Sequence, residues 1–140
     1  MSKGYSLAGL RFGYCIGCPE IINGLLKVKD SYNVDAISIA VATAAIADQN
    51  YLKETVNKIK EQRALLTAKL KKMGFSVTDS NANFVLVKYK NEAKTIFNKL
   101  IEKGIFVRYW DCPGLADKLR ITVGTEEQNH MLIDAIETIV

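Results

Sequence analysis

Residues 51–74 read YLKETVNKIKEQRALLTAKLKKMG and form the clearest periodic segment of the chain. Apolar residues recur there at steps of three and four, which is the spacing of one face of an α-helix. Gly74 follows the last apolar residue, where a left-handed glycine commonly ends a helix. The segment therefore predicts a helix over residues 51–73 with one continuous apolar stripe. The stripe consists of Leu52, Val56, Ile59, Leu66, Leu70 and Met73.

Downstream of this helix, short apolar runs alternate with polar breaks and with one more helical pattern. Apolar residues at helical spacing follow Asn91, which we expect to cap a helix that Gly104 ends. Thr125 and Gln128 form a capping box ahead of a final helix. The four runs that read as strands are residues 75–78, 84–87, 105–109 and 119–123.

The predicted order of elements from Tyr51 onward is helix, strand, strand, helix, strand, strand, helix. A small, mostly antiparallel sheet covered on one face by helices is the natural assembly for this order. The sequence therefore predicts the α/β class, as an α+β small domain.

The chain before this domain carries a different pattern. Residues 10–16 are aromatic and aliphatic and read as a buried strand, and Pro19 suits the first turn of a helix that runs to about Asp30. Residues 36–47 are rich in alanine and predict a helix buried on most sides. The polar residues that follow mark a boundary, so we expect one domain over residues 1–47 and a second over residues 48–140.

Composition excludes several classes of function. The chain has 140 residues, 49% of them hydrophobic, and its net charge of +4 comes from lysines scattered among acids. Without a basic block or interleaved aromatic residues, a nucleic-acid partner is not expected. Without an apolar run of about 20 residues, no membrane span is expected, and the protein is expected to be soluble.

The three cysteines are Cys15, Cys18 and Cys112, an odd number in a chain with no signal-peptide pattern. A reduced, cytoplasmic setting is therefore expected. Cys15 and Cys18 have the spacing of a metal or redox pair, but a second pair is absent and His130 is far along the chain. We expect buried thiols and no metal site.

Several polar side chains lie close together in the sequence near the start of the chain, among them Ser2, Lys3 and Arg11. A lysine there has two interpretations, a solvated charge or an amine that attacks a carbonyl. The lysine alone favours the first interpretation, because most lysines are solvated.

The motif Ser2-Lys3 followed by Leu7-Ala8-Gly9-Leu10-Arg11-Phe12-Gly13-Tyr14 resembles the active-site segment of fold-type-I aminotransferases that use pyridoxal phosphate. Within that family it is most similar to the histidinol-phosphate aminotransferases. The resemblance implies that Lys3 bonds the cofactor aldehyde, that Arg11, eight positions later, binds the cofactor phosphate, and that Ser2 lies in the cofactor site. A primary amine and a guanidinium suit an aldehyde and a phosphate.

Two arginines and an asparagine match the family's substrate residues. By resemblance, Arg108 contacts the substrate phosphate, Arg120 holds the substrate carboxylate and Asn83 opens a strand beside them. Both arginines lie in otherwise apolar strands, so an anionic partner is expected, because a buried unpaired guanidinium is costly. Internal ion pairs to Asp111, Asp117 or another acid are the alternative for the arginines, and a plain turn residue is the alternative for Asn83.

The resemblance spans essentially the whole chain. It implies the C-terminal part of a transferase of this fold, in which residues 1–47 belong to the tail of the large domain and residues 48–140 form the small domain. It also implies a homodimer that moves an amino group between histidinol phosphate and 2-oxoglutarate in histidine biosynthesis. The upstream cofactor contacts of the family are not in this sequence. We therefore expect a truncated chain, a split gene product or an expressed fragment, inactive alone.

Two other functions stay open. One is a non-catalytic module that binds a small anion or a partner through Arg108 and Arg120. The other is a related cofactor enzyme, either an aromatic aminotransferase or a decarboxylase of a phosphorylated amino acid. The predicted strand near Leu10 would also have a free edge, which favours self-association.

Overall fold

The structure is a computed structural model that describes residues 1–90 and 92–140. It divides into two compact units, Met1–Val56 and Asn57–Val140. The division falls within helix α3 (Gln49–Lys72), whereas the expected domain boundary precedes that helix.

Helix α3 confirms the long helix expected from the periodic segment, with a start two residues earlier. Gly74 has φ +88°, and the N–H of Phe75 donates to the carbonyl of Leu70 at 3.0 Å. A side chain is strained in that left-handed conformation, so the glycine ends the helix and turns the chain into the sheet.

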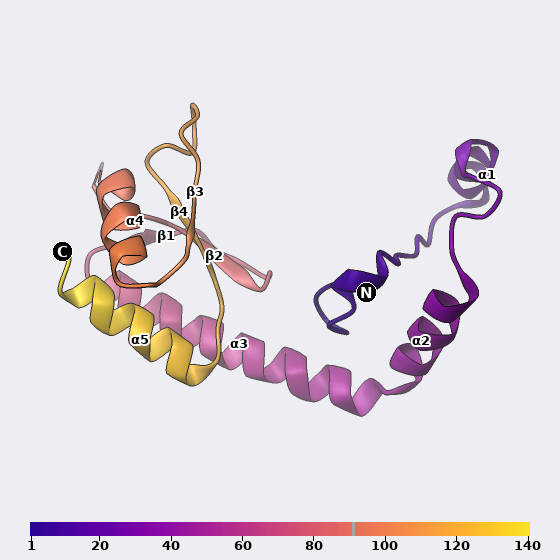
Figure 1. Ribbon diagram of the computed structural model, residues 1–140, viewed down its shortest axis with the longest axis horizontal. Helices are drawn as coiled ribbons and strands as arrows, with labels where there is room; N and C mark the ends of the chain where they lie inside the picture. Colours follow the sequence, from indigo (N-terminus) through magenta and orange to yellow (C-terminus); the bar gives the residue numbers. More distant parts are fainter. Residues whose placement is uncertain (91) are drawn as a thin grey trace. The chain divides into compact units, whose positions relative to one another are not determined.

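The C-terminal unit contains a four-stranded sheet in the order β1-β2-β4-β3, and every pairing is antiparallel. Its arrangement is visible in Figure 1. Strand β3 covers only part of the run expected over residues 105–109, because it is an edge strand and pairs with β4 at only two positions. The strands are β1 (Ser76–Val77), β2 (Phe84–Lys88), β3 (Arg108–Tyr109) and β4 (Leu119–Thr122).

Two more helices complete this unit, α4 (Ala93–Glu102) and α5 (Glu126–Glu137). Gly104 adopts φ +74° just after α4, and Thr125 and Gln128 form the expected capping box at the start of α5. The expected cap of α4, Asn91, lies outside the described residues. Figure 1 shows α5 running beside the C-terminal half of α3.

One face of the sheet carries the core. Alternate residues of the two central strands are buried, Val85 and Val87 in β2 and Leu119 and Ile121 in β4. Side chains from all three helices of the unit join them in one cluster. The expected sheet, covered on one face by helices, is therefore confirmed. The helical members of the cluster include Leu66, Leu70, Ile96, Leu100, Leu132, Ile133 and Ile136.

The N-terminal unit contains a short 3-10 helix, η1 (Ala8–Leu10), and the helices α1 (Pro19–Val28) and α2 (Ala36–Ala47). The buried strand expected over residues 10–16 is wrong: Arg11 is in a turn and residues 12–18 follow as irregular chain. Among the described residues no strand pairs with this segment, and a strand requires such a partner for its backbone N–H and C=O groups. The expected association through a strand edge therefore has no formed edge to use.

The helix boundaries in this unit were correct, but its predicted burial was not. Asp35 caps α2 by accepting from the N–H of Ser38 at 2.8 Å. Only Ser38 and Ala42 of α2 are buried, although the helix was expected to be covered on most sides. The apolar composition of a helix indicates which residues would be stabilised by burial. Burial also requires a neighbouring helix or sheet that covers them.

Leu70→Ala should destabilise the C-terminal unit by about 2–5 kcal/mol, because Leu70 is fully buried in the core cluster and its loss leaves a cavity. The free energy of unfolding in urea measures the change. Leu65→Ala is the matched control, the same substitution on the same helix at a side chain that is 56% exposed. Equal effects of the two substitutions would contradict the assigned core.

Candidate functional site

The face of the sheet opposite the core brings the two predicted substrate arginines together. Arg120 lies in the central strand β4, directly opposite Arg108 of β3 on one side and Leu86 of β2 on the other. Residues two apart in a strand share a face, so Phe84 also belongs to this surface. We call the surface formed by Phe84, Leu86, Arg108 and Arg120 the open face.

The two arginines differ in burial. Arg120 is half-buried in its central strand, whereas Arg108 is exposed. The expectation that both are buried is therefore wrong for Arg108, because β3 is the edge strand of the sheet. Like charges directly opposite each other across two strands repel, so an anion on the open face would relieve this repulsion.

The acids that could have neutralised these arginines are paired with lysines. The carboxylate of Asp111 lies 3.0 Å from the ammonium of Lys94, and that of Asp117 contacts two other lysines. Within residues 1–90 and 92–140, no carboxylate lies within ion-pair distance of Arg108 or Arg120. The structure therefore contradicts the alternative of internal ion pairs for the arginines.

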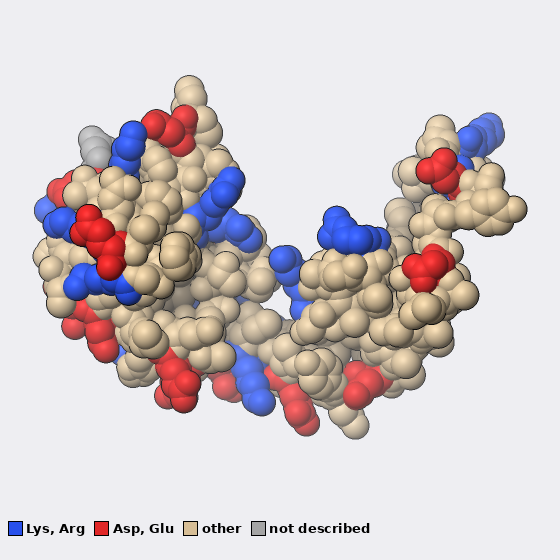
Figure 2. All heavy atoms as spheres, viewed as in Figure 1, with Lys and Arg blue, Asp and Glu red and all other residues tan. Residues whose placement is uncertain are grey.

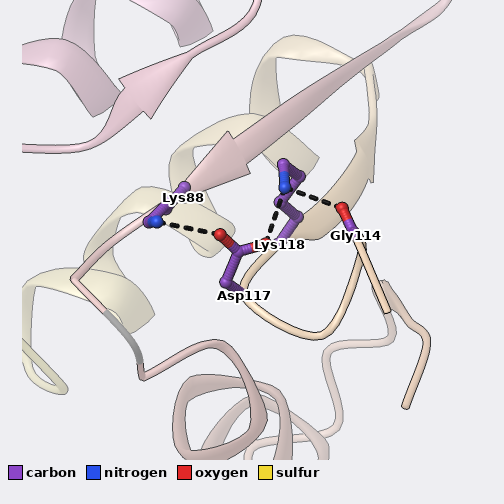
Figure 3. A network of polar contacts seen from close by, with 4 residues as sticks. All are labelled: Lys88, Gly114, Asp117 and Lys118. Carbon is purple, nitrogen blue, oxygen red and sulfur yellow. Dashed lines mark hydrogen bonds and ion pairs between the residues drawn. The ribbon is translucent and has the colours of Figure 1, made fainter. Parts of the chain in front are cut away.

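Asp117 joins the end of β2 to the start of β4 through a small polar network (Figure 3). Its carboxylate lies 2.6 Å from the Lys118 ammonium and 2.8 Å from that of Lys88. Lys118 also donates to the carbonyl of Gly114 at 2.7 Å. Hydrogen bonds from Lys118 and then Lys88 lower the pKa of the Asp117 carboxyl from 3.8 to about 2.

Aromatic rings lie where an acid would be expected beside each arginine. The Arg120 guanidinium carbon is 4.3 Å from the centroid of the Phe84 ring, and that of Arg108 is 5.3 Å from the Trp110 ring. Both distances are within the range of cation–π attraction. Sequence reasoning missed both rings. Phe84 and Leu86 are two residues apart in β2, so the sequence already indicated that they share one face. Only the strand register shows that Phe84 lies next to Arg120.

Asn83 extends the central pairing by one residue, since its carbonyl accepts from the N–H of Val123 at 2.9 Å. It is half-buried and adjacent to Phe84. The backbone of Asn83 therefore has a structural part at the end of β2. Its expected contact with substrate stays a prediction.

The predicted cofactor residues lie together in a folded segment of the N-terminal unit. The carbonyl of Lys3 accepts from the N–H of Ser6 at 3.1 Å, and the N–H of Arg11 donates to the carbonyl of Ala8 at 3.4 Å. Ser2 is half-buried, while Lys3 and Arg11 are exposed. Two consecutive turns thus carry the amine and the guanidinium.

Arg11 has φ 51°, a left-handed conformation that is uncommon for residues other than glycine. Its guanidinium Nη1 donates to the carbonyl of Ala8 at 3.3 Å, which ties the side chain back to η1. The donor set of this segment fits pyridoxal phosphate, since an exposed primary amine can bond an aldehyde and a planar guanidinium can bind a phosphate.

The three cysteines are exposed, so the expectation of buried thiols is wrong. Cys15 and Cys18 lie in or beside the irregular segment that forms no strand, and Cys112 lies between β3 and β4. In the part of the chain that the structure describes, no three metal-ligating side chains gather as a metal site would require. No helix in that part combines the length and apolar character needed to cross a membrane.

The family model for aminotransferase class I and II matches residues 1–136. The chain belongs to this family. Histidinol-phosphate aminotransferase 1 from Nostoc sp. is 56% identical over 137 residues, which cover 97% of this chain and 39% of that protein. The resemblance that the Lys3 and Arg11 motif suggested is therefore confirmed.

Solved structures agree with this aminotransferase membership. The histidinol-phosphate aminotransferase from Clostridium acetobutylicum matches with a TM-score of 0.89 at 28% identity, over 99% of this chain and 43% of that one. The enzyme from Sinorhizobium meliloti in complex with pyridoxal-5'-phosphate matches with a TM-score of 0.84 at 30% identity, over 99% of this chain and 40% of that one. The chain thus spans about two fifths of the length of these relatives.

Asp117→Asn should flatten the acid dependence of stability. The folded state lowers the pKa of Asp117, so this carboxylate stabilises the fold above about pH 4, and the contribution is lost as pH falls toward 2. We expect the free energy of unfolding in urea to fall less for the variant than for the wild type over this interval.

Asp134→Asn, at an exposed aspartate of α5, is the control and should follow the wild type. A wild-type acid dependence in Asp117→Asn would show that the network with Lys88 and Lys118 does not stabilise the fold.

Proposed function

We propose that this chain carries the lysine and the substrate arginines of an aminotransferase that uses pyridoxal phosphate and acts on histidinol phosphate. The observation that carries the proposal is the pair Arg108 and Arg120 on the open face, where nearby aspartates are already bound by lysines. Two guanidinium groups side by side suit the doubly charged phosphate of histidinol phosphate and the two carboxylates of 2-oxoglutarate, because each guanidinium can bind a carboxylate or a phosphate with two hydrogen bonds.

In this proposal each residue acts on a separate group. Arg11 would bind the cofactor phosphate, with Ser2 as a further residue of the cofactor site. Lys3 would hold the cofactor at its aldehyde. Its free Nζ would take the proton from the substrate α-carbon as general base and then donate that proton as general acid. When bound, pyridoxal phosphate supplies the electron-withdrawing ring that makes this proton removable.

The substrate arginines orient the substrate without taking part in proton transfer. Arg108 holds the phosphate of histidinol phosphate, and Arg120 meets the same phosphate because this substrate has no carboxylate. With 2-oxoglutarate, Arg120 holds a carboxylate. Asn83 lies at the end of the strand beside Phe84. Binding by the arginines holds the α-carbon of the substrate in one orientation. This fixed orientation is how the binding raises the reaction rate.

The two alternative enzymes, an aromatic aminotransferase and a decarboxylase of a phosphorylated amino acid, are compared with this proposal by the substrates that they would bind. An aromatic side chain offers no anionic group to a second cation, so the paired arginines favour a phosphorylated amino substrate over a purely aromatic one. A decarboxylase of a phosphorylated amino acid shares that requirement and differs in its product. For either reaction we propose a cytoplasmic homodimer, and for transamination 2-oxoglutarate as the amino acceptor, on the family membership alone.

The cofactor part of the proposal predicts selective labelling of Lys3. After incubation with pyridoxal phosphate and reduction with borohydride, peptide mass spectrometry should find the cofactor mainly on Lys3. Lys3→Ala should lose the absorbance band that appears when the aldehyde condenses with an amine. We expect partial occupancy, because Arg11 and Ser2 supply only some of the contacts that such a cofactor needs.

Lys27→Ala is the matched control, since Lys27 is an exposed lysine of α1 in the same unit. It should label like the wild type. Equal labelling of the exposed lysines, with no preference for Lys3, would leave the chain as a binding module without cofactor chemistry.

Arg120→Gln should weaken the binding of histidinol phosphate by about tenfold or more, because a charge-assisted hydrogen bond is worth about 1.5–3 kcal/mol. Isothermal titration calorimetry measures the affinity. Lys99→Gln, at an exposed lysine of α4, removes the same charge elsewhere and should leave the affinity unchanged. Unchanged binding by Arg120→Gln would remove the substrate role from this residue.

A further inference from the structure

Arg120 has an unusual environment for a half-buried cation. Its neighbours across the sheet are an apolar side chain, Leu86, and a second cation, Arg108. Within the described ranges, none of the ion pairs involves Arg120. No acid of this part of the chain therefore fixes the orientation of its long, flexible side chain.

Phe84 lies at the right place in the register to do this. It pairs with Thr122, so it is the diagonal neighbour of Arg120, and such neighbours are within reach of aromatic and long side chains. The guanidinium carbon lies 4.3 Å from the centroid of the Phe84 ring. Phe84 is half-buried, and its pairing with Thr122 of β4 fixes the backbone position from which the ring extends.

A ring and an acid would hold the arginine with different consequences. A carboxylate would occupy the N–H groups and neutralise the charge that an incoming anion needs. A ring attracts the guanidinium through its face and leaves the N–H groups, which lie in the guanidinium plane, free to donate. The arginine is then oriented before the ligand arrives, and less side-chain freedom is lost on binding.

We propose that Phe84 is a positioning residue that orients the Arg120 guanidinium for the anionic group of the substrate. The inference rests on the proposed function, because it takes Arg120 as a residue that binds the anionic group of the substrate. Trp110, whose ring lies 5.3 Å from the guanidinium carbon of Arg108, is the corresponding ring for the other arginine. Phe84 acts through Arg120 and need not touch the substrate.

The experiment compares variants that keep or remove the aromatic face. Phe84→Leu keeps an apolar side chain and removes the ring, whereas Phe84→Tyr keeps the ring. Phe106→Leu makes the same substitution at a phenylalanine that is 80% exposed and lies before β3. Phe84→Ile, with a side chain suited to strands, serves if Phe84→Leu fails to fold by circular dichroism.

Two readouts are measured on the full chain. Calorimetry gives the affinity for histidinol phosphate, which we expect Phe84→Leu to weaken about tenfold, Phe84→Tyr to change less than about twofold and Phe106→Leu to leave unchanged. Nuclear magnetic resonance gives the Arg120 Nε proton, identified by its loss in Arg120→Gln. The ring current of Phe84 should shift this resonance upfield in the free wild type and in Phe84→Tyr, but not in Phe84→Leu.

The outcomes distinguish this inference from the proposed function. If the wild type does not bind histidinol phosphate, the proposed function fails and the inference fails with it. If the wild type binds, and a folded Phe84→Leu or Phe84→Ile binds equally well, only the positioning role is overturned. Weakened binding together with the loss of the ring-current shift supports the role, because a purely structural defect would not be rescued by tyrosine.

Discussion

The antiparallel pairing of β2 with β4 is the interaction on which the rest of the C-terminal unit depends. It joins segments far apart in the sequence and fixes which residues share a face. Because side chains alternate in a strand, the register that sends Val85 and Ile121 into the core also sends Phe84 and Arg120 to the open face. One set of backbone hydrogen bonds thus determines both the core and the candidate substrate site.

Among the described residues, three lysines of this unit pair with acids, whereas the two arginines on the open face do not. Lys88 and Lys118 bind Asp117, and Lys94 binds Asp111. Blue and red side chains are correspondingly interspersed over the surface of the C-terminal unit that Figure 2 shows. The open face therefore places two arginines opposite each other on one side of the sheet with no carboxylate of the described residues paired to either, and this suits it to an anionic ligand.

The N-terminal unit shows which features can be predicted from short sequence motifs in the absence of tertiary contacts. Pro19 and Asp35 begin helices α1 and α2 where the sequence indicated, because a first-turn proline and a capping carboxylate act within one turn. The strand expected near Leu10 did not form, since a strand is stabilised by a partner and a helix by its own backbone. Apolar residues of α2 are exposed for the same reason: no layer of the described residues covers them.

The sequence by itself determined the helices and their ends, the family through Lys3 and Arg11, and the arginines that carry the candidate substrate site. Each of these depends on residue type and short spacing. The tertiary structure decided which aspartates are available, which face Arg120 occupies and that Phe84 lies beneath its guanidinium. Those features depend on strand register and sheet order, which bring residues of separate segments together, as the pairing of Phe84 with Thr122 does, and no periodicity in a single segment encodes such a contact.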